Sequence, residues 1–411
     1  MGEPSMKRKK IYTSRDLLGL GLAEESMTSE PVIMSSNDQK QQHSAPEDFL
    51  RPPQPSFLRP SVSSRDVDAI SQGSEAVEGS VISSTTDRYG FLGDHDDPVT
   101  KYATPDVDLI RKREAKWLDM FSDWDIYMLR NYKKVRERCR KGIPGSVRAR
   151  AWIHLCGAKY KMEQTDNKST FKRLREEKAE QKYVDDIHKD LHRNFPTHEL
   201  FGGNYEKIGQ TELFLVLKAY SVLNPVQGYC QAQAPIAALL LMHMPSEAAF
   251  WCLVAVCDNY IPGYYDEGME AIQLEGAILL GLLRKVSPGI YRHLKKQEIE
   301  PILFMMEWFL CVFIRTLPWP SVIRVWDIFM CEGVKILFRV ALVLLKFSLP
   351  RSVRKKCPSM YETLNVLKNL PESITNEEFL IDQIGKLKIT EEDMETEHRK
   401  QVELRKKMKQ N

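Results

Sequence analysis

The sequence lacks the features that mark membrane-spanning, secreted and zinc-binding proteins. Its longest candidate apolar run, residues 235–244, is too short to cross a bilayer, which takes about 20 residues, and the N-terminus has no apolar core of a signal peptide. The eight cysteines form no Cys-x-x-Cys pair, and no matching histidine spacing completes a zinc site. Most of them lie in apolar stretches, so we expect a reduced intracellular protein with buried thiols.

Three further absences narrow the class of function. The formal net charge is only +3, so nothing in the total favours nucleic-acid binding. No Gly-x-x-x-x-Gly-Lys-Ser/Thr motif is present, so the chain is not expected to bind a nucleotide itself. Alternating patterns typical of strands are also missing, which predicts an all-α protein.

Composition divides the chain into four parts. Residues 1–86 are rich in Ser, Pro, Gln and acidic residues, and we expect them to be disordered. Gly2 is a poor candidate for acylation, because Met6 stands where a Ser or Thr is usual. Residues 87–141 predict a helical lead-in, residues 142–350 a succession of about ten or more apolar helices without a fixed repeat, and residues 351–411 a helical extension with a basic end.

Local patterns place the boundaries of several helices. In the lead-in a helix is predicted over residues 109–140, with Trp117, Met120, Phe121 and Trp124 on one stripe. The following KGIPGS breaks it, and Ser146 is expected to cap the next helix.

A second predicted helix carries an acidic and a basic side chain near its end. Val184, Ile187, Leu191 and Phe195 form its apolar stripe, and Pro196 predicts an end near Phe195. Asp190 and Arg193 are three residues apart and can touch. The pair is either an ordinary surface ion pair, which contributes only a few tenths of a kcal/mol, or an arginine available to another molecule.

The stretch GYCQ, residues 228–231, follows a turn formed by Asn224, Pro225 and Gly228. Since Pro235 suits the first turn of a helix, we expect a helix to begin near residues 233–235 and Gln231 to lie on the loop before it. Taken alone, Gln231 is a polar loop residue that satisfies backbone groups. Cys230 has no base nearby in the sequence and is expected to be a small packing residue.

The three histidines around Arg193 do not complete a metal-binding set. We expect structural or surface roles for His188, His192 and His198.

Four motifs in order resemble the TBC-domain family of Rab GTPase-activating proteins. They are GIPGSVRARAW at 142–152, Ile-x-x-Asp-x-x-Arg at 187–193, Tyr-Cys-Gln at 229–231, and Arg-Val-Trp-Asp at 324–327 with the Glu-Gly and Phe-Arg-Val-Ala-Leu that follow. In the most common form of the third motif, Gly-Met-Asn follows the glutamine. This chain instead has GYCQAQAP, which is similar to the carabin-like subgroup. The resemblance extends from about Asp87 to Phe379.

The resemblance implies a single large multi-helical TBC domain with two helical lobes. It also implies that Arg193 is an arginine finger and Gln231 a glutamine finger, both supplied in trans, with Asp190 orienting the arginine and Tyr229 positioning the glutamine loop by packing. The expected partner is a Rab-family GTPase in its GTP state, which would carry the GTP and Mg²⁺, so no cofactor of its own is expected.

Such a protein would regulate vesicle trafficking. It would be cytoplasmic and recruited to plasma or endosomal membranes through a peripheral contact. Two alternatives stay open: a non-catalytic scaffold that binds GTPases or signalling proteins, and an activator of a Ras-like GTPase outside the Rab branch. Which Rab would be the substrate and the oligomeric state are also left open.

Overall fold

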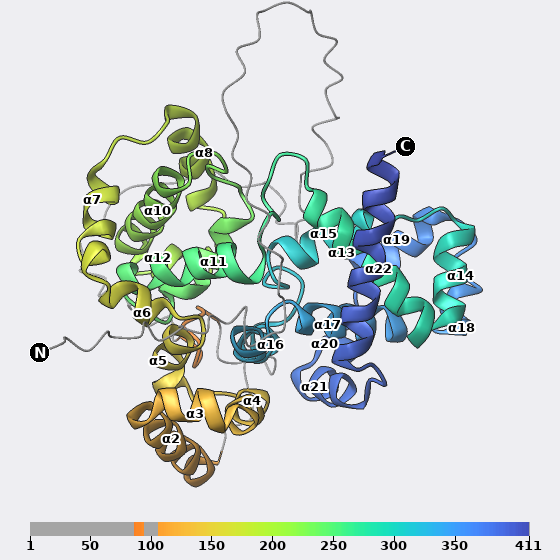
Figure 1. Ribbon diagram of the computed structural model, residues 1–411, viewed down its shortest axis with the longest axis horizontal. Helices are drawn as coiled ribbons and strands as arrows, with labels where there is room; N and C mark the ends of the chain where they lie inside the picture. Colours follow the sequence, from red (N-terminus) through yellow and green to blue (C-terminus); the bar gives the residue numbers. More distant parts are fainter. Residues whose placement is uncertain (1–85, 94–105, 411) are drawn as a thin grey trace, which may run out of the picture. The chain divides into compact units, whose positions relative to one another are not determined.

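The computed structural model describes residues 86–93 and 106–410 (Figure 1). Within these residues the structure is helical, apart from two isolated β-bridges that join Thr86 to Leu92 and Phe91 to His198. The expected all-α fold is therefore confirmed for the described chain. The expectation of disorder for residues 1–86 falls, except for Thr86, outside the described residues.

The lead-in is three helices rather than the predicted single one. These are α2 (Val107–Ser122), α3 (Trp124–Arg130) and α4 (Tyr132–Arg140), separated at Asp123 and Asn131. Asp and Asn compete with helical hydrogen bonding and favour such breaks. The two ends of the lead-in pack on different partners, α2 on α5 and α4 on α16.

The start of α5 (Gly145–Leu155) is held from across the core and not by the predicted Ser146 cap. The N-cap residue is Pro144, which has no side-chain cap, and the Ser146 hydroxyl is hydrogen-bonded to Glu114 instead. Asp327 of α16 (Trp319–Glu332) is fully buried and accepts a hydrogen bond from the Ile143 amide at 2.8 Å. Its other carboxylate oxygen accepts from Arg148 Nε at 3.1 Å and Trp152 Nε1 at 3.0 Å.

The helices pack in two groups, as expected for two helical lobes. In the first, α10 lies against α7, α8, α9, α11 and α12; in the second, α17 lies against α13, α15, α16, α19, α20 and α21. Helix α16 also packs on α4 and α5 and so joins the groups.

The bounds in the first group are α6 (Ala158–Glu163), η3 (Thr165–Asn167), α7 (Thr170–Glu176), α8 (Gln181–Leu191), α9 (Glu199–Gly202), α10 (Glu206–Leu223), α11 (Gln233–Leu241), α12 (Ser246–Ala255) and the π-helix η4 (Val256–Tyr260). Those in the second are α13 (Glu270–Val286), α14 (Pro288–Lys296), α15 (Ile302–Leu310), α17 (Lys335–Ser348), α18 (Arg351–Arg354), α19 (Met360–Lys368), α20 (Glu372–Thr375), α21 (Glu377–Lys386) and α22 (Glu391–Gln410).

The charged C-terminal segment forms a docked helix. Helix α22 packs along α13, as Figure 1 shows, and buries Met394. Lys335 of α17 reaches Glu395 at 3.0 Å, and Lys409 reaches Glu270 at 2.8 Å. The boundaries predicted at residues 142 and 350 stay predictions, because both the lead-in and this extension pack on the central helices.

The described residues contain no helix long and apolar enough to cross a membrane and no cluster of His, Cys, Asp and Glu suited to a metal ion. All eight cysteines are free thiols; seven are buried and Cys230 is partly exposed.

Candidate functional site

The arginine of the Ile-x-x-Asp-x-x-Arg motif lies on a turn after α8, not on the helix. The prediction of a helix end near Phe195 was wrong, because α8 ends at Leu191. The buried Asn194 explains the early end: its side-chain amide donates to the Asp190 carbonyl at 2.7 Å, a competing bond typical of Asn. Phe195 then adopts a left-handed conformation with φ of 50°.

Asp190 connects the arginine turn with the glutamine stretch. The residue is 4% exposed, and one carboxylate oxygen accepts from Arg193, which confirms the predicted contact. The other oxygen accepts a hydrogen bond from the Tyr229 hydroxyl at 2.6 Å. A buried carboxylate needs such partners. The Arg193 side chain remains 44% exposed, so one edge of the guanidinium is held while much of it faces solvent.

Tyr229 does more than the packing expected from the sequence. Its hydroxyl is a hydrogen-bond donor to Asp190, and burial raises the pKa of Tyr229 well above its usual value, with Cys230 adding to the shift and Arg193 opposing it. The phenol therefore stays protonated and able to donate at neutral pH.

The segment 224–232, here called the glutamine loop, is closed by a backbone hydrogen bond and by a bond to the first residue of α11. The Gly228 amide donates to the Asn224 carbonyl at 2.7 Å, and the Cys230 amide donates to Gln233 Oε1 at 3.1 Å. Gly228 has φ of 63°, which favours glycine, and a Cβ there would lie 2.0 Å from Cζ of Tyr183, so a larger residue would strain the backbone and displace the Tyr183 ring.

Gln231 lies on the turn before α11, which begins at Gln233 as predicted. Its carbonyl accepts from the Ala234 amide at 3.2 Å. Its side-chain amide forms no hydrogen bond with the described residues and is partly exposed. The interpretation that this side chain satisfies backbone groups therefore finds no support, and the carboxamide is available to an incoming molecule.

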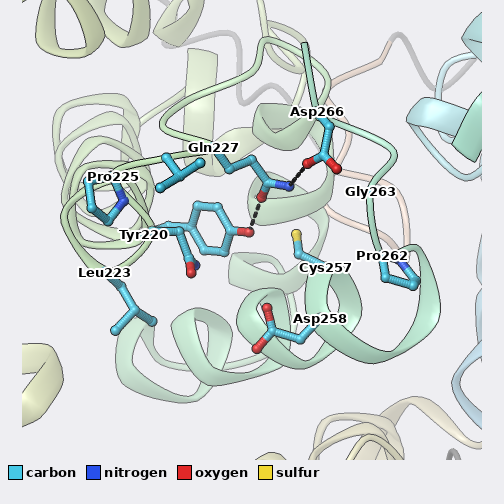
Figure 2. A pocket seen from close by; sticks show the side chains of 11 residues that line it. Tyr220, Leu223, Pro225, Gln227, Cys257, Asp258, Pro262, Gly263 and Asp266 are labelled. Atoms are coloured by element: carbon cyan, nitrogen blue, oxygen red, sulfur yellow. Dashed lines mark hydrogen bonds between the residues drawn. The ribbon is translucent and has the colours of Figure 1, made fainter. Parts of the chain in front are cut away.

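A pocket of about 350 Å³ lies beside the glutamine loop (Figure 2). Tyr220, Gln227 and Asp266 line it together with the ends of two helices, and Figure 2 shows the Gln227 carboxamide between the Tyr220 hydroxyl and the Asp266 carboxylate. Sequence reasoning did not find this group, because nothing local connects residue 266 with the loop.

Arg315 is a second residue that sequence reasoning missed. Its Nη2 donates to Oδ1 of Asn194 at 3.2 Å, next to the arginine turn. It follows two buried residues with left-handed backbones, Val312 at φ 49° and Phe313 at φ 60°. Such conformations cost roughly 1–3 kcal/mol each and must be held by their surroundings. The Trp326 indole contributes by donating to the Val312 carbonyl at 3.2 Å.

Two of the three histidines near the arginine have structural contacts, as expected. His198 accepts from the Leu200 amide at 3.1 Å at the start of α9 and contacts the Tyr89 carbonyl at 2.9 Å. Burial lowers the pKa of His198, so it is neutral. His188 stacks on Phe214 with ring centroids 4.6 Å apart.

Comparison with known sequences identifies relatives over most of the chain. The family model described as the Rab-GTPase-TBC domain matches residues 145–352. The chain is 51% identical over 340 residues to human "TBC1 domain family member 10B", covering 82% of this chain and 41% of that protein. It is 48% identical to "TBC1 domain family member whacked" of Drosophila melanogaster (80% and 90% covered) and 45% identical to mouse "Carabin" (77% and 70% covered). The chain thus spans about two fifths of the length of the member 10B relatives.

Solved structures show the same fold. The Chlamydomonas flagellar RabGAP TBC domain aligns with a TM-score of 0.55 and 28% identity, covering 73% of this chain and 99% of that one. The Ypt/Rab-GAP domain of Gyp1p aligns with a TM-score of 0.52 and 19% identity, covering 68% and 97%. The fold expected from the four motifs is confirmed.

Proposed function

The chain belongs to the Rab-GTPase-TBC domain family, and from this membership we propose that it accelerates GTP hydrolysis by Rab-family GTPases, supplying Arg193 and Gln231 in trans. The contacts of the Asp190 carboxylate support this proposal most directly. Its two oxygens accept hydrogen bonds from Arg193 and Tyr229 and so link the arginine turn to the glutamine loop. One buried residue thereby sets the relative placement of the two proposed fingers.

Hydrolysis moves the γ-phosphoryl group from the β–γ bridging oxygen to water through a transition state whose negative charge is spread over the phosphoryl and bridging oxygens. Arg193 would neutralise that charge, because a planar and permanently charged guanidinium can contact two oxygens at once. Asp190 holds one edge of it and would leave the other N–H groups for the phosphates. An arginine supplied in this way typically contributes about 10³ to 10⁵ in rate.

Gln231 would orient the attacking water. Its side-chain amide has an acceptor and a donor, and neither is bound by the described residues. A GTPase that hydrolyses GTP slowly does not hold the attacking water in a fixed position. An amide group that is already positioned on the activating protein can orient that water. GTP and Mg²⁺ belong to the partner as substrate. Since Rab proteins are membrane-anchored, the activity would take place at a membrane surface, where this chain makes a peripheral contact.

The test is single-turnover phosphate release from a panel of GTP-loaded Rab and other Ras-like GTPases. Wild-type protein is compared with Arg193→Ala, Arg193→Lys and Gln231→Ala. The matched control is Lys189→Ala, which removes an exposed cation of α8 that pairs with Asp186 at 2.9 Å.

We expect one or a few Rabs to be activated, Arg193→Ala to lower the rate by about 10³ or more, and Lys189→Ala to match wild type. Arg193→Lys keeps the charge but loses the two-oxygen contact, so it should also be strongly impaired. GTPases that bind without acceleration would refute the proposal in favour of a scaffold. Activation confined to GTPases outside the Rab branch would refute the substrate assignment alone.

A further inference from the structure

The glutamine loop is also anchored at a second residue, Gln227. We propose that Tyr220, Gln227 and Asp266 form a tether, called here the Gln227 tether, that positions Gln231 for its action on the partner's nucleotide. This inference rests on the proposed function and deepens it. In it Gln227 is a positioning residue that acts through Gln231 and does not touch the partner.

Both ends of the Gln227 side-chain amide are engaged. The Tyr220 hydroxyl donates to Gln227 Oε1 at 2.5 Å, and Gln227 Nε2 donates to Asp266 Oδ1 at 3.3 Å (Figure 2). The carboxylate can only accept, so the amide nitrogen must face Asp266 and the amide oxygen must face the hydroxyl. Burial raises the pKa of Tyr220 above its usual value, which keeps that hydroxyl protonated. The bonds thus determine one orientation of the side chain.

One attachment point is buried in a helix, and the other is exposed on a turn-containing segment. Tyr220 is 1% exposed and lies in the last turn of α10. Asp266 lies in the irregular segment between η4 and α13, where its carbonyl accepts from the Met269 amide at 2.9 Å. The tether therefore connects the loop to a helix on one side and to a separate segment 39 residues away on the other.

The loop needs such a tether because packing does not support it there. The tip residue Val226 is fully exposed, and the pocket of about 350 Å³ lies next to the loop. A segment with few buried contacts samples other conformations easily. On this side the hydrogen bonds of Gln227 take over the role that packed side chains have elsewhere.

The tether and the Asp190 contact hold the loop at two points separated by Gly228. Gln227 is bound on the pocket side, Tyr229 is bound to Asp190, and Gly228 turns the backbone between them with φ of 63°. Gln231 follows two residues after Tyr229. With both points held, the backbone that carries Gln231 has little freedom; with one released, the loop can pivot about the other.

The test uses the full chain and the GTPase found most responsive in the panel, with kcat and KM measured for Gln227→Ala. We expect kcat to fall about tenfold, because Gln231 is no longer held in place, and KM to change less than twofold, because Gln227 does not touch the partner. Gln297→Ala is the matched control. Its amide is also bound at both ends, to Cys357 at 2.8 Å and Thr363 at 2.6 Å, but lies in the other group of helices. It should leave both constants unchanged.

A double-mutant cycle separates positioning from a general loss of structure. On a Gln231→Ala background, Gln227→Ala should cause no further loss of kcat, because the side chain that it positions is gone. Asp266→Asn keeps an acceptor oxygen and should be near wild type, whereas Asp266→Leu should reproduce Gln227→Ala.

Three results would overturn the tether: the same loss of kcat on both backgrounds, an unchanged kcat in Gln227→Ala, or a raised KM with kcat unchanged. A wild-type chain that activates no GTPase overturns the proposed function and the tether with it. An active wild type that is insensitive to Gln227→Ala overturns the tether alone.

Discussion

Removal of the Asp190 carboxylate should weaken both the fold and the activity, by amounts that follow from its contacts. Asp190→Ala leaves the partly buried Tyr229 hydroxyl without its acceptor, which costs roughly 1–3 kcal/mol. The lost pairing with the 44% exposed Arg193 adds less than about 1 kcal/mol, because solvent screens it. We therefore expect the free energy of unfolding to fall by about 1–4 kcal/mol in total.

The effect on activation should be smaller than that of removing the arginine itself. In Asp190→Ala the Arg193 guanidinium keeps its charge but is no longer held in one orientation. The glutamine loop also loses its attachment through Tyr229. We expect the rate of the activated GTPase to fall about 10- to 100-fold, equivalent to roughly 1.4–2.7 kcal/mol, against 10³-fold or more for Arg193→Ala.

Urea denaturation followed by tryptophan fluorescence and single-turnover phosphate release provide the two measurements. Asp186→Ala is the control, since this carboxylate lies one turn earlier on α8 and pairs with the exposed Lys189. It should leave both quantities unchanged. Asp190→Asn keeps the shape and one acceptor, so it should fold better than Asp190→Ala. A folded Asp190→Ala protein with activity within threefold of wild type would refute the reasoning.

Four other changes test particular contacts. Asp327→Ala leaves the Arg148 guanidinium and the Trp152 indole without their buried acceptor and should lower the free energy of unfolding by about 3–5 kcal/mol in urea denaturation; a loss below about 1 kcal/mol would contradict this. Arg315→Ala removes the donor to Asn194 and should lower kcat of activation about tenfold, with Arg315→Lys intermediate; equal activity would show that the contact is unimportant. Gly228→Ala should lower activation strongly, because its Cβ would meet Tyr183, whereas Gly385→Ala in α21 has open space and should leave activity unchanged. Burial lowers the pKa of His243 to about 3, so between pH 6.5 and 3 the unfolded chain binds a proton that the folded chain does not. The free energy of unfolding should therefore fall as the pH drops from about 6.5 towards 3. In urea titrations over that range, His243→Phe should show a weaker fall.

Features that depend on neighbours along the chain could be predicted from the amino-acid sequence. The apolar stripe of Val184, Ile187 and Leu191 predicted α8, and the Asn-Pro turn with Gly228 placed Gln231 on a loop before α11, as observed. The contact between Asp190 and Arg193 was also predicted, from their spacing of three residues, although Arg193 makes it from the turn after α8 and not from the helix. Family membership was readable from four short motifs in order, and the family model confirms it.

Features that depend on residues far apart in the chain became visible in the folded structure. The predicted helix over residues 109–140 is divided into three helices whose ends pack on different partners, and the start of α5 is hydrogen-bonded to Asp327 and not capped by Ser146. The bond from Arg315 to Asn194 spans 121 residues, and those of Asp266 and Asp190 to the glutamine loop each span 39. Periodicity and turn propensity report only on the nearest few residues, whereas these contacts form when packed helices bring distant side chains together.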